Sequence, residues 1–123
     1  MKYIHTEKSP KAIGPYSQAT VINNTVYISG QIPLNPEAFE LENDIKLATK
    51  RCLENLLNIV EAAGSSLEKI AKVNVYVTDI DDFSDINEVY EAFFKEHKPA
   101  RALVEVSRLP KDAKIEIEAV AAL

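Results

Sequence analysis

The apolar and polar positions of the chain change their spacing several times, and each change predicts a different element. Residues 3–5 are typical of the start of a short strand, and residues 19–30 contain two β-branched runs that meet at an Asn-Asn pair. Asparagine tolerates the positive φ of a tight turn, so residues 19–30 predict a β-hairpin. Pro33 and Pro36 interrupt the segment that follows, which predicts a loop because proline has no N–H group for a central strand.

From residue 43 onward the apolar positions recur every three or four residues, which is the spacing of one helix face. These positions are Ile45, Ala48, Cys52, Leu56, Ile59 or Val60, and Ala63. Asn43 is the expected N-cap, with Asp44 in the first turn. Gly64 is the expected residue after the C-cap, since glycine adopts the left-handed conformation at little cost.

The second half of the chain predicts one more helix and three more strands. In residues 70–79, Val73, Val75 and Val77 alternate with more polar residues, which predicts a strand with the valines on one face. Helical spacing returns over residues 84–97 and is expected to end before Pro99. The last two predicted strands cover residues 101–107 and 114–121, with a turn at residues 110–113.

The predicted order β-β-β-α-β-α-β-β favours an α+β fold, in which two helices pack on one face of a mixed sheet. The final two strands are expected to pair antiparallel across their short turn, which would bring Arg101 near Glu116. The other sheet face is expected to expose an apolar surface, through the valines of residues 73–77 or the row of Ile115 and Ile117. Such a face predicts association with other copies.

Composition narrows the class of protein. The 123 residues are 46% hydrophobic and 27% charged, which is typical of one globular domain spanning residues 1–123. A net charge of −5 without a basic stripe argues against nucleic-acid binding through phosphate neutralisation. Since the chain shows neither an apolar leader nor a run of 18 apolar residues, a soluble cytoplasmic protein without membrane contact is expected.

Two groups of charged residues are candidates for chemistry. Alternation places Arg101, Leu103 and Glu105 on one side of their strand, and Arg101 is either a surface ion-pair partner or a clamp for a carboxylate. Glu116 and Glu118 share one face of the last strand. They form either a solvated face or a site where one carboxylate orients a water molecule.

Two loops add polar groups that suit either a simple connection or a small polar ligand. AIGPYSQ contains Tyr16, Ser17 and Gln18, and ISGQIP contains Ser29 and Gly30.

Other kinds of site are not indicated. Cys52 is expected to be a small core residue, and a single cysteine excludes an internal disulfide. His5 and His97 have no ligand-like spacing with acidic residues, so no metal site is expected. Neither of the glycine-rich nucleotide-binding motifs is present.

Several motifs taken together are similar to one known family, and they follow one another in the same order from about residue 4 to residue 122. They are AIGPYSQA (12–19), YISGQIPLNP (27–36), LENL and EAAG (53–64), NEVYEAFF (87–94), KPAR (98–101) and EVSRLPKDAKIEIEAVA (105–121). On these residues the chain resembles the reactive intermediate deaminase A (RidA/YjgF) family.

The resemblance implies a chorismate-mutase-like α+β domain that assembles as a homotrimer with active sites between subunits. It also implies hydrolysis of 2-imino or enamine acids, such as 2-iminobutanoate and 2-iminopropanoate, to 2-keto acids and ammonia without a cofactor. Pyridoxal-phosphate enzymes such as threonine dehydratase release these reactive acids. By position, Arg101 corresponds to the arginine that binds the substrate carboxylate, and Glu116 to the glutamate that positions water. The residues that correspond to the cleft lining are Tyr16, Ser29, Gly30 and Asn87.

The chain departs from the family pattern at two positions. Leu103 stands where many members have cysteine, so a thiol is not essential here, and Leu103 is expected to contact the substrate. Phe39 replaces a common glycine and is expected to alter a surface turn. Two alternative functions stay open, namely a keto-acid-sensing or chaperone-like trimer without turnover, and an endoribonuclease or translation inhibitor. The net charge of −5 disfavours the nuclease.

Overall fold

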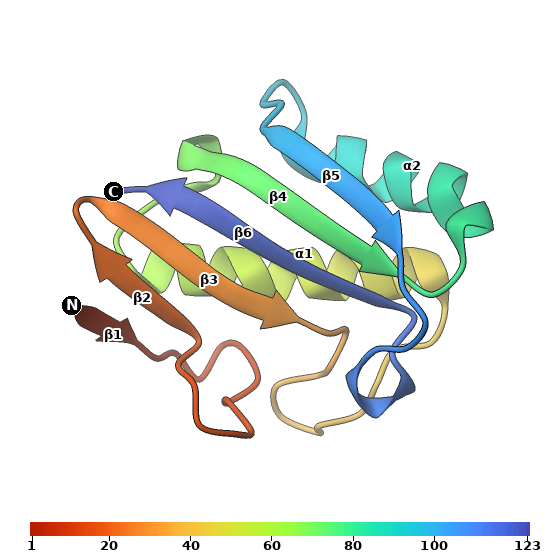
Figure 1. The fold of residues 1–123 in the computed structure, drawn as a ribbon, viewed down its shortest axis with the longest axis horizontal. Helices are drawn as coiled ribbons and strands as arrows, with labels where there is room; N and C mark the ends of the chain where they lie inside the picture. The colour runs from red at the N-terminus through yellow and green to blue at the C-terminus, as the bar shows by residue number, and fades with distance from the viewer.

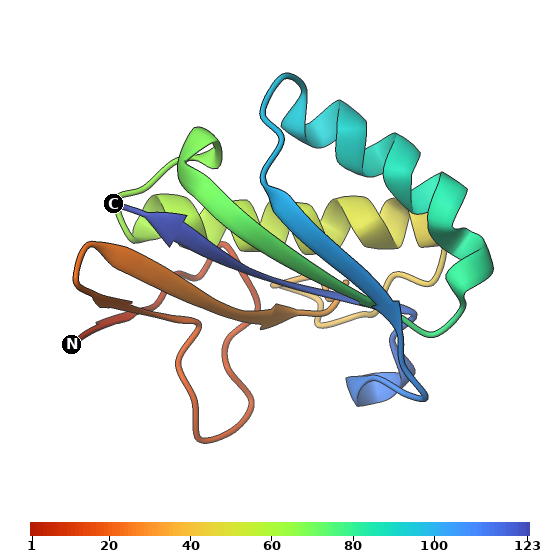
Figure 2. The ribbon, with the colours of Figure 1, turned by 45° about the horizontal axis from the view of Figure 1, so that its top comes forward.

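The computed structural model describes residues 1–123 as one mixed six-stranded sheet with two helices on the same face (Figures 1 and 2). The strands are β1 (Lys2–Ile4), β2 (Ala19–Ile22), β3 (Thr25–Gln31), β4 (Ile70–Val77), β5 (Ala100–Glu105) and β6 (Ile115–Ala122). The helices are α1 (Ile45–Ala62) and α2 (Phe83–Phe94), and the strand order is β1-β2-β3-β6-β4-β5. Only the β4 and β5 pair is parallel. The predicted α+β class is therefore confirmed.

The N-terminal hairpin forms where the sequence predicts it. Asn23 and Asn24 both have positive φ, 51° and 59°, and connect β2 to β3 between the paired residues Ile22 and Thr25. Two consecutive residues in this conformation match the right-handed twist of the strands.

Helix α1 has the predicted buried face but begins one residue later than expected. The N-cap is Asp44 rather than Asn43, since the Asp44 side chain accepts a hydrogen bond from the Leu47 N–H at 3.1 Å. Gly64 ends the helix with a φ of +90°, as predicted. Neither α1 nor α2 is both long enough and apolar enough to cross a membrane.

Helix α2 ends at Phe94, three residues before the predicted end at His97. Lys95 leaves the helical path with φ 57° and ψ −118°. Pro99 therefore lies in the connection to β5 and does not itself terminate the helix.

Phe39 adopts a φ of 59°, a conformation that favours glycine, so the unusual residue lies at a turn of left-handed geometry. Its ring centre is 6.0 Å from the Lys111 Nζ, and the side chain is half-buried.

The predicted pairing of the last two strands is wrong, because β4 lies between β5 and β6. The unit β4–α2–β5 is a parallel crossover, which places β5 on the outer side of β4. Residues 106–114 then return past the end of β4, so that β6 pairs antiparallel with both β4 and β3.

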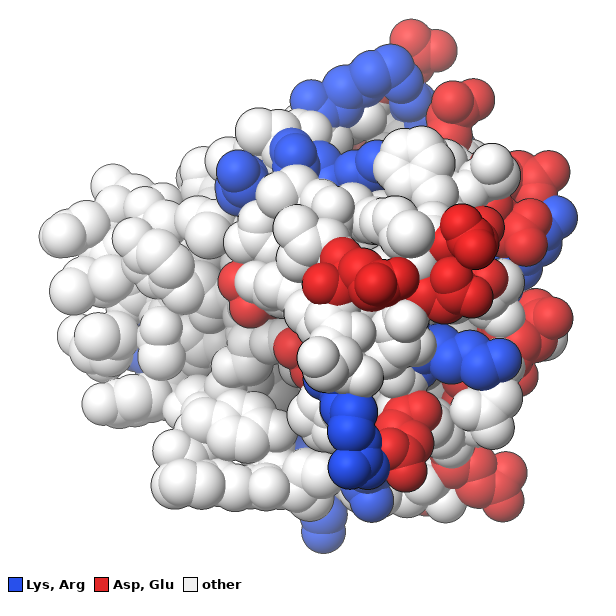
Figure 3. Space-filling view, turned by 45° about the vertical axis from the view of Figure 1, so that its right-hand side comes forward, with Lys and Arg blue, Asp and Glu red and all other residues white.

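The predicted apolar face is also wrong. The valines of β4 and the isoleucines of β6 are fully buried against the helices. The residues between them point to the opposite face of the sheet, here called the open face, which carries apolar, polar and charged side chains. Its residues include Tyr27, Asn74, Tyr76, Val104, Glu116, Glu118 and Val120. Figure 3 shows that most charged side chains gather on one part of the surface and leave a large uncharged area beside it.

Candidate active site

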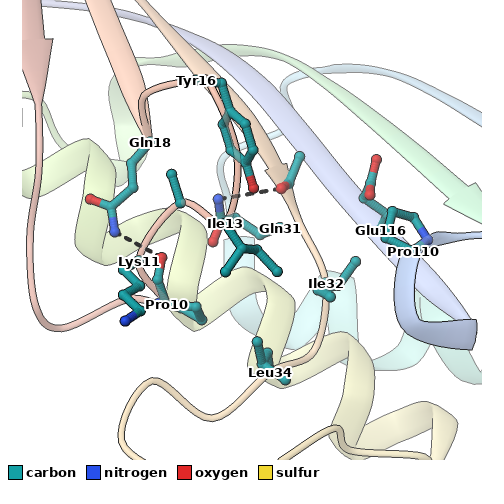
Figure 4. A pocket seen from close by; sticks show the side chains of 12 residues that line it. Pro10, Lys11, Ile13, Tyr16, Gln18, Gln31, Ile32, Leu34, Pro110 and Glu116 are labelled. Atoms are coloured by element: carbon teal, nitrogen blue, oxygen red, sulfur yellow. Dashed lines mark hydrogen bonds between the residues drawn. The ribbon is translucent and has the colours of Figure 1, made fainter. Parts of the chain in front are cut away.

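The first candidate site is a small pocket on the open face, here called the glutamate pocket. Its lining includes Tyr16, Gly30, Gln31, Pro110 and Glu116, and its volume is about 70 Å³. Figure 4 shows that Tyr16 comes from the loop before β2, Gln31 from the end of β3, Glu116 from β6 and Pro110 from the turn that precedes β6. The space is large enough for water molecules.

A β-bulge in β3 shapes this pocket. Ile28 pairs with Ala119 and Gln31 pairs with Ile117, so β3 contains one residue more than β6 between these pairs. The extra residue turns the Gln31 side chain toward the buried face. Gly30 then lies directly against the Glu116 carboxylate, since a Cβ on Gly30 would be only 2.6 Å from the Glu116 Oε2. A side chain on Gly30 would therefore displace the carboxylate.

The surroundings of Glu116 make it a stronger base than an ordinary glutamate. Partial burial raises the pKa of Glu116, and the negative charge of Glu118 raises it further. Glu118 itself accepts a hydrogen bond from the Asn74 Nδ2 at 3.2 Å. No salt bridge in the chain involves Glu116. A partly desolvated carboxylate with raised pKa is typical of functional sites.

Hydrogen bonds hold the loop of residues 12–18 beside the pocket. The Ser29 hydroxyl donates to the Ser17 carbonyl oxygen at 2.6 Å, and the Ser29 N–H donates to the Gln18 carbonyl oxygen at 2.9 Å. The buried Gln18 side chain donates to the Pro10 carbonyl oxygen at 2.9 Å and accepts from the Thr6 N–H at 2.7 Å. Gln18 therefore fixes the loop, and the side chains of Ile13 and Tyr16 remain exposed at the pocket, where a ligand can contact them.

The second candidate site surrounds Arg101 at the start of β5. Its Nη1 donates to the Asn87 Oδ1 at 2.8 Å, and its guanidinium carbon lies 4.7 Å from the Tyr90 ring centre and 5.9 Å from that of Phe83. None of the four salt bridges in the chain involves Arg101. The guanidinium is thus held by neutral groups of α2, and its charge has no carboxylate partner in its own chain.

The Arg101 side chain lines a groove of about 330 Å³, here called the arginine groove. Its lining includes Asn87, Tyr90, Glu91, Lys95, Lys98 and Arg101.

Tyr90 and Phe83 were not identified from the sequence as candidate site residues. The available signal was spacing, because Tyr90 lies three residues after Asn87 on the same side of the helix. The Tyr90 hydroxyl is buried without a hydrogen-bond partner, and burial raises its pKa.

Leu103 lies on the same face of β5 as Arg101 and packs partly against the core. The N–H of Val106 donates to the Val77 carbonyl oxygen. Every second residue of a strand bonds to the same neighbouring strand, so Val106, Val104 and Ala102 are the residues whose backbone groups face β4. By this alternation the backbone N–H and C=O of Leu103 point toward the free edge of the sheet. They are available to a ligand or to another chain.

The two sites lie on opposite faces of the sheet. Arg101 pairs with the buried Val73, and Glu116 pairs with Tyr76 on the open face. The two residues are separated by two strand spacings, about 10 Å, and by three residues along β4, about another 10 Å. The expectation that pairing of the last two strands brings Arg101 near Glu116 is therefore wrong. Tyr16 and Gly30 line the glutamate pocket with Glu116, and Ser29 lines a separate hollow that also includes Tyr16. Asn87 lines the arginine groove, and Leu103 shares the face of β5 that carries Arg101.

The structure contains no group of three or more residues able to hold a metal ion. Cys52 is fully buried, as predicted, and its Sγ lies 3.8 Å from the Ile115 carbonyl oxygen. Burial raises the pKa of the Cys52 thiol well above its usual value.

Comparison with known proteins gives full-length matches. The model of a family described as Endoribonuclease L-PSP matches residues 6–123. A RutC family protein of Pyrococcus abyssi is 56% identical over 119 residues, which cover 96% of this chain and 94% of that protein. The 2-iminobutanoate/2-iminopropanoate deaminase of Escherichia coli K12 is 50% identical over 123 residues, covering 98% and 96%. The crystal structure of Escherichia coli TdcF with bound serine matches with a TM-score of 0.97 and 47% identity, covering 100% of this chain and 99% of that one.

Proposed function

The chain belongs to the Endoribonuclease L-PSP (RidA/YjgF) family, and on this premise we propose that it hydrolyses small 2-imino acids and their enamine tautomers to 2-keto acids and ammonia. The observation that carries the proposal is Arg101, an oriented guanidinium without a carboxylate partner in its own chain. Two relatives support the substrate class. One is named 2-iminobutanoate/2-iminopropanoate deaminase, and the other holds serine, which is a small amino acid.

Arg101 binds the substrate carboxylate in this proposal. The guanidinium presents two parallel N–H groups to a carboxylate, which fixes the orientation of the acid as well as its position. Asn87 and Tyr90 hold the guanidinium in place, so little side-chain entropy is lost on binding. Leu103, two residues along the same face, provides the apolar contact beside the substrate.

Glu116 positions and deprotonates the attacking water. The water oxygen forms a bond to the imine carbon, the π-electron pair moves to the nitrogen, and the nitrogen takes up a proton. The resulting carbinolamine then loses ammonia as its C–N bond breaks and the C=O bond forms. The raised pKa of Glu116 suits a group that accepts a proton from water and returns it within one turnover. An imine carbon is already electrophilic, so orientation and one base supply the chemistry.

Since Arg101 and Glu116 lie on opposite faces, we propose that the complete site forms between two copies of the chain. The arginine groove of one copy faces the glutamate pocket of the next, and three copies close the ring. The open face supports association, because the large side chains of Tyr27 and Val104 are 49% and 46% exposed there. Each of three sites would then combine residues from two neighbours.

The proposal is tested by supplying the imine enzymatically. Threonine dehydratase produces 2-iminobutanoate from threonine, and semicarbazide traps the imine that has not been hydrolysed. Wild-type protein is expected to lower the trapped fraction, and Arg101→Ala is expected to reduce this effect by about 100-fold or more, since a bound carboxylate loses its charged partner.

Arg108→Ala is the matched control, because Arg108 is exposed and pairs only with Asp112 at 2.7 Å. It should behave as wild type. The proposal is wrong if wild-type protein leaves the trapped fraction unchanged, or if Arg101→Ala lowers it as well as wild type does.

A further inference from the structure

The arginine groove contains more positive charge than one carboxylate requires. Lys95, Lys98 and Arg101 line it, against a single acidic residue, Glu91. None of these four residues takes part in a salt bridge, although the chain as a whole has a net charge of −5. Figure 3 shows several basic side chains at the top of the view, near the region where α2 ends and β5 begins, with acidic side chains at their outer edge. The groove is therefore a local cationic site on an acidic protein.

The backbone between α2 and β5 brings the two lysines together. Lys95 leaves the helix with φ 57° and ψ −118°, which turns the chain back toward β5. The Lys98 Nζ then donates to the Lys95 carbonyl oxygen at 3.2 Å, which places this ammonium group at the turn. Its remaining N–H groups have no acceptor in the chain.

We propose that Lys95 and Lys98 form a second anion subsite, which binds the distal carboxylate of a dicarboxylic 2-imino acid while Arg101 binds the carboxylate next to the imine. This inference rests on the proposed function and names its preferred substrate class, the imines derived from acidic amino acids. The groove volume of about 330 Å³ leaves room for an acid longer than 2-iminopropanoate. Both lysines are exposed, so the subsite favours dicarboxylates through charge and leaves monocarboxylates able to bind.

The test compares two substrates in matched variants. The kcat/KM values of 2-iminoglutarate and 2-iminopropanoate, each generated in place by an amino-acid oxidase, are measured for wild type, Lys95→Gln, Lys98→Gln and the double variant. Each single substitution is expected to lower kcat/KM for 2-iminoglutarate by about threefold to fivefold, and the double by about tenfold. The value for 2-iminopropanoate should change by less than about twofold. Lys50→Gln, an exposed lysine of α1 outside the groove, is the control and should change neither value.

A binding measurement separates this inference from the proposed function. Calorimetry measures the affinity of the protein for 2-ketoglutarate and for 2-ketobutyrate without any turnover. The double variant should lose affinity only for 2-ketoglutarate. If imines are hydrolysed but the variants treat both acids as wild type does, the subsite is wrong and the deaminase proposal stands. If no imine is hydrolysed while 2-ketoglutarate binding still depends on the lysines, the deaminase proposal is wrong and the anion subsite stands. Equal losses for both acids would also overturn the subsite.

Discussion

The glutamate pocket and the arginine groove are built in different ways. The pocket is made of backbone features, since the bulge in β3 and the absence of a side chain at Gly30 leave room for the Glu116 carboxylate. The groove is made of side chains, because α2 supplies the amide and the aromatic rings that hold Arg101. Burial raises the pKa of Glu116 in the pocket, whereas neutral side chains orient the guanidinium of Arg101 in the groove.

This difference shows how one sheet can carry a proton acceptor on one face and an anion-binding group on the other. A strand presents alternate residues to opposite faces, so a proton acceptor on β6 and an anion-binding cation on β5 can occur in one sheet without neutralising each other. An Arg101–Glu116 ion pair within one chain is prevented by the sheet itself. The two groups remain available, and under the proposed function a second copy brings them together.

The largest expected effect comes from mixing two inactive variants. Arg101→Ala and Glu116→Gln should each lose about 100-fold or more in imine hydrolysis, because one lacks the carboxylate clamp and the other the base. After the two proteins are unfolded and refolded together at equal amounts, about one quarter of the sites should combine an intact Arg101 with an intact Glu116 from different copies. Activity should therefore recover to about one quarter of the wild-type value.

The control for this mixture pairs Arg101→Ala with a chain that carries both substitutions, and it should recover nothing. Native mass spectrometry verifies that mixed oligomers have formed. Mixed oligomers without recovered activity would show that both residues act from the same copy.

A smaller effect is expected from two glycine substitutions that separate activity from stability. Gly30→Ala places a Cβ against Glu116 and should reduce kcat/KM by about tenfold, since a displaced base no longer meets the water correctly. Gly64→Ala has open space around its Cβ but a φ of +90°, so it should cost about 1 kcal/mol of unfolding free energy and leave kcat/KM unchanged. Kinetics and urea denaturation measure the two effects. Equal kcat/KM values for the two variants would argue against the close contact between Gly30 and Glu116.

The smallest expected effect concerns pH. Glu116 must be ionised to accept a proton from water, and its pKa is raised, so activity should fall on acidification at a higher pH than for an ordinary glutamate. The charge of Glu118 is the second cause of this shift. Glu118→Gln should therefore lower the pKa of Glu116 and move the acidic limb of the kcat/KM profile to lower pH. A limb that stays in place, or moves to higher pH, would contradict this assignment.

The local parts of the fold could be predicted from the sequence. The hairpin at Asn23 and Asn24 and the buried face of α1 follow from turn chemistry and hydrophobic period, which depend on neighbouring residues only. Strand order depends on distant contacts, and the short distance between β5 and β6 in sequence suggested the wrong pair. The strand–helix–strand pattern of β4, α2 and β5 was the better signal, since such units favour parallel neighbours.

The candidate site was predictable only in part. Alternation along the last strand placed Glu116 and Glu118 on one face, but the distinct position of Glu116 depends on its contact with Gly30 on the neighbouring strand β3. Alternation also placed Arg101 and Leu103 together, as the structure has them. The bulge between Ile28 and Gln31 leaves no pattern in the sequence, because its extra residue is recognised only against the partner strand.

The bulge also determines where this chain tolerates insertions and deletions. Removing one residue at Ser29 or Gly30 would leave Ile28 and Gln31 two residues apart, as in a regular strand, so Gln31 would stay buried opposite Ile117, but the bulge that brings Gly30 against the Glu116 carboxylate would be lost. Within the connection between β5 and β6, residues 107–113 form no backbone hydrogen bond to a strand, and a change of length there leaves every strand register intact. Among related sequences, length variation is therefore expected in that connection and not at the end of β3.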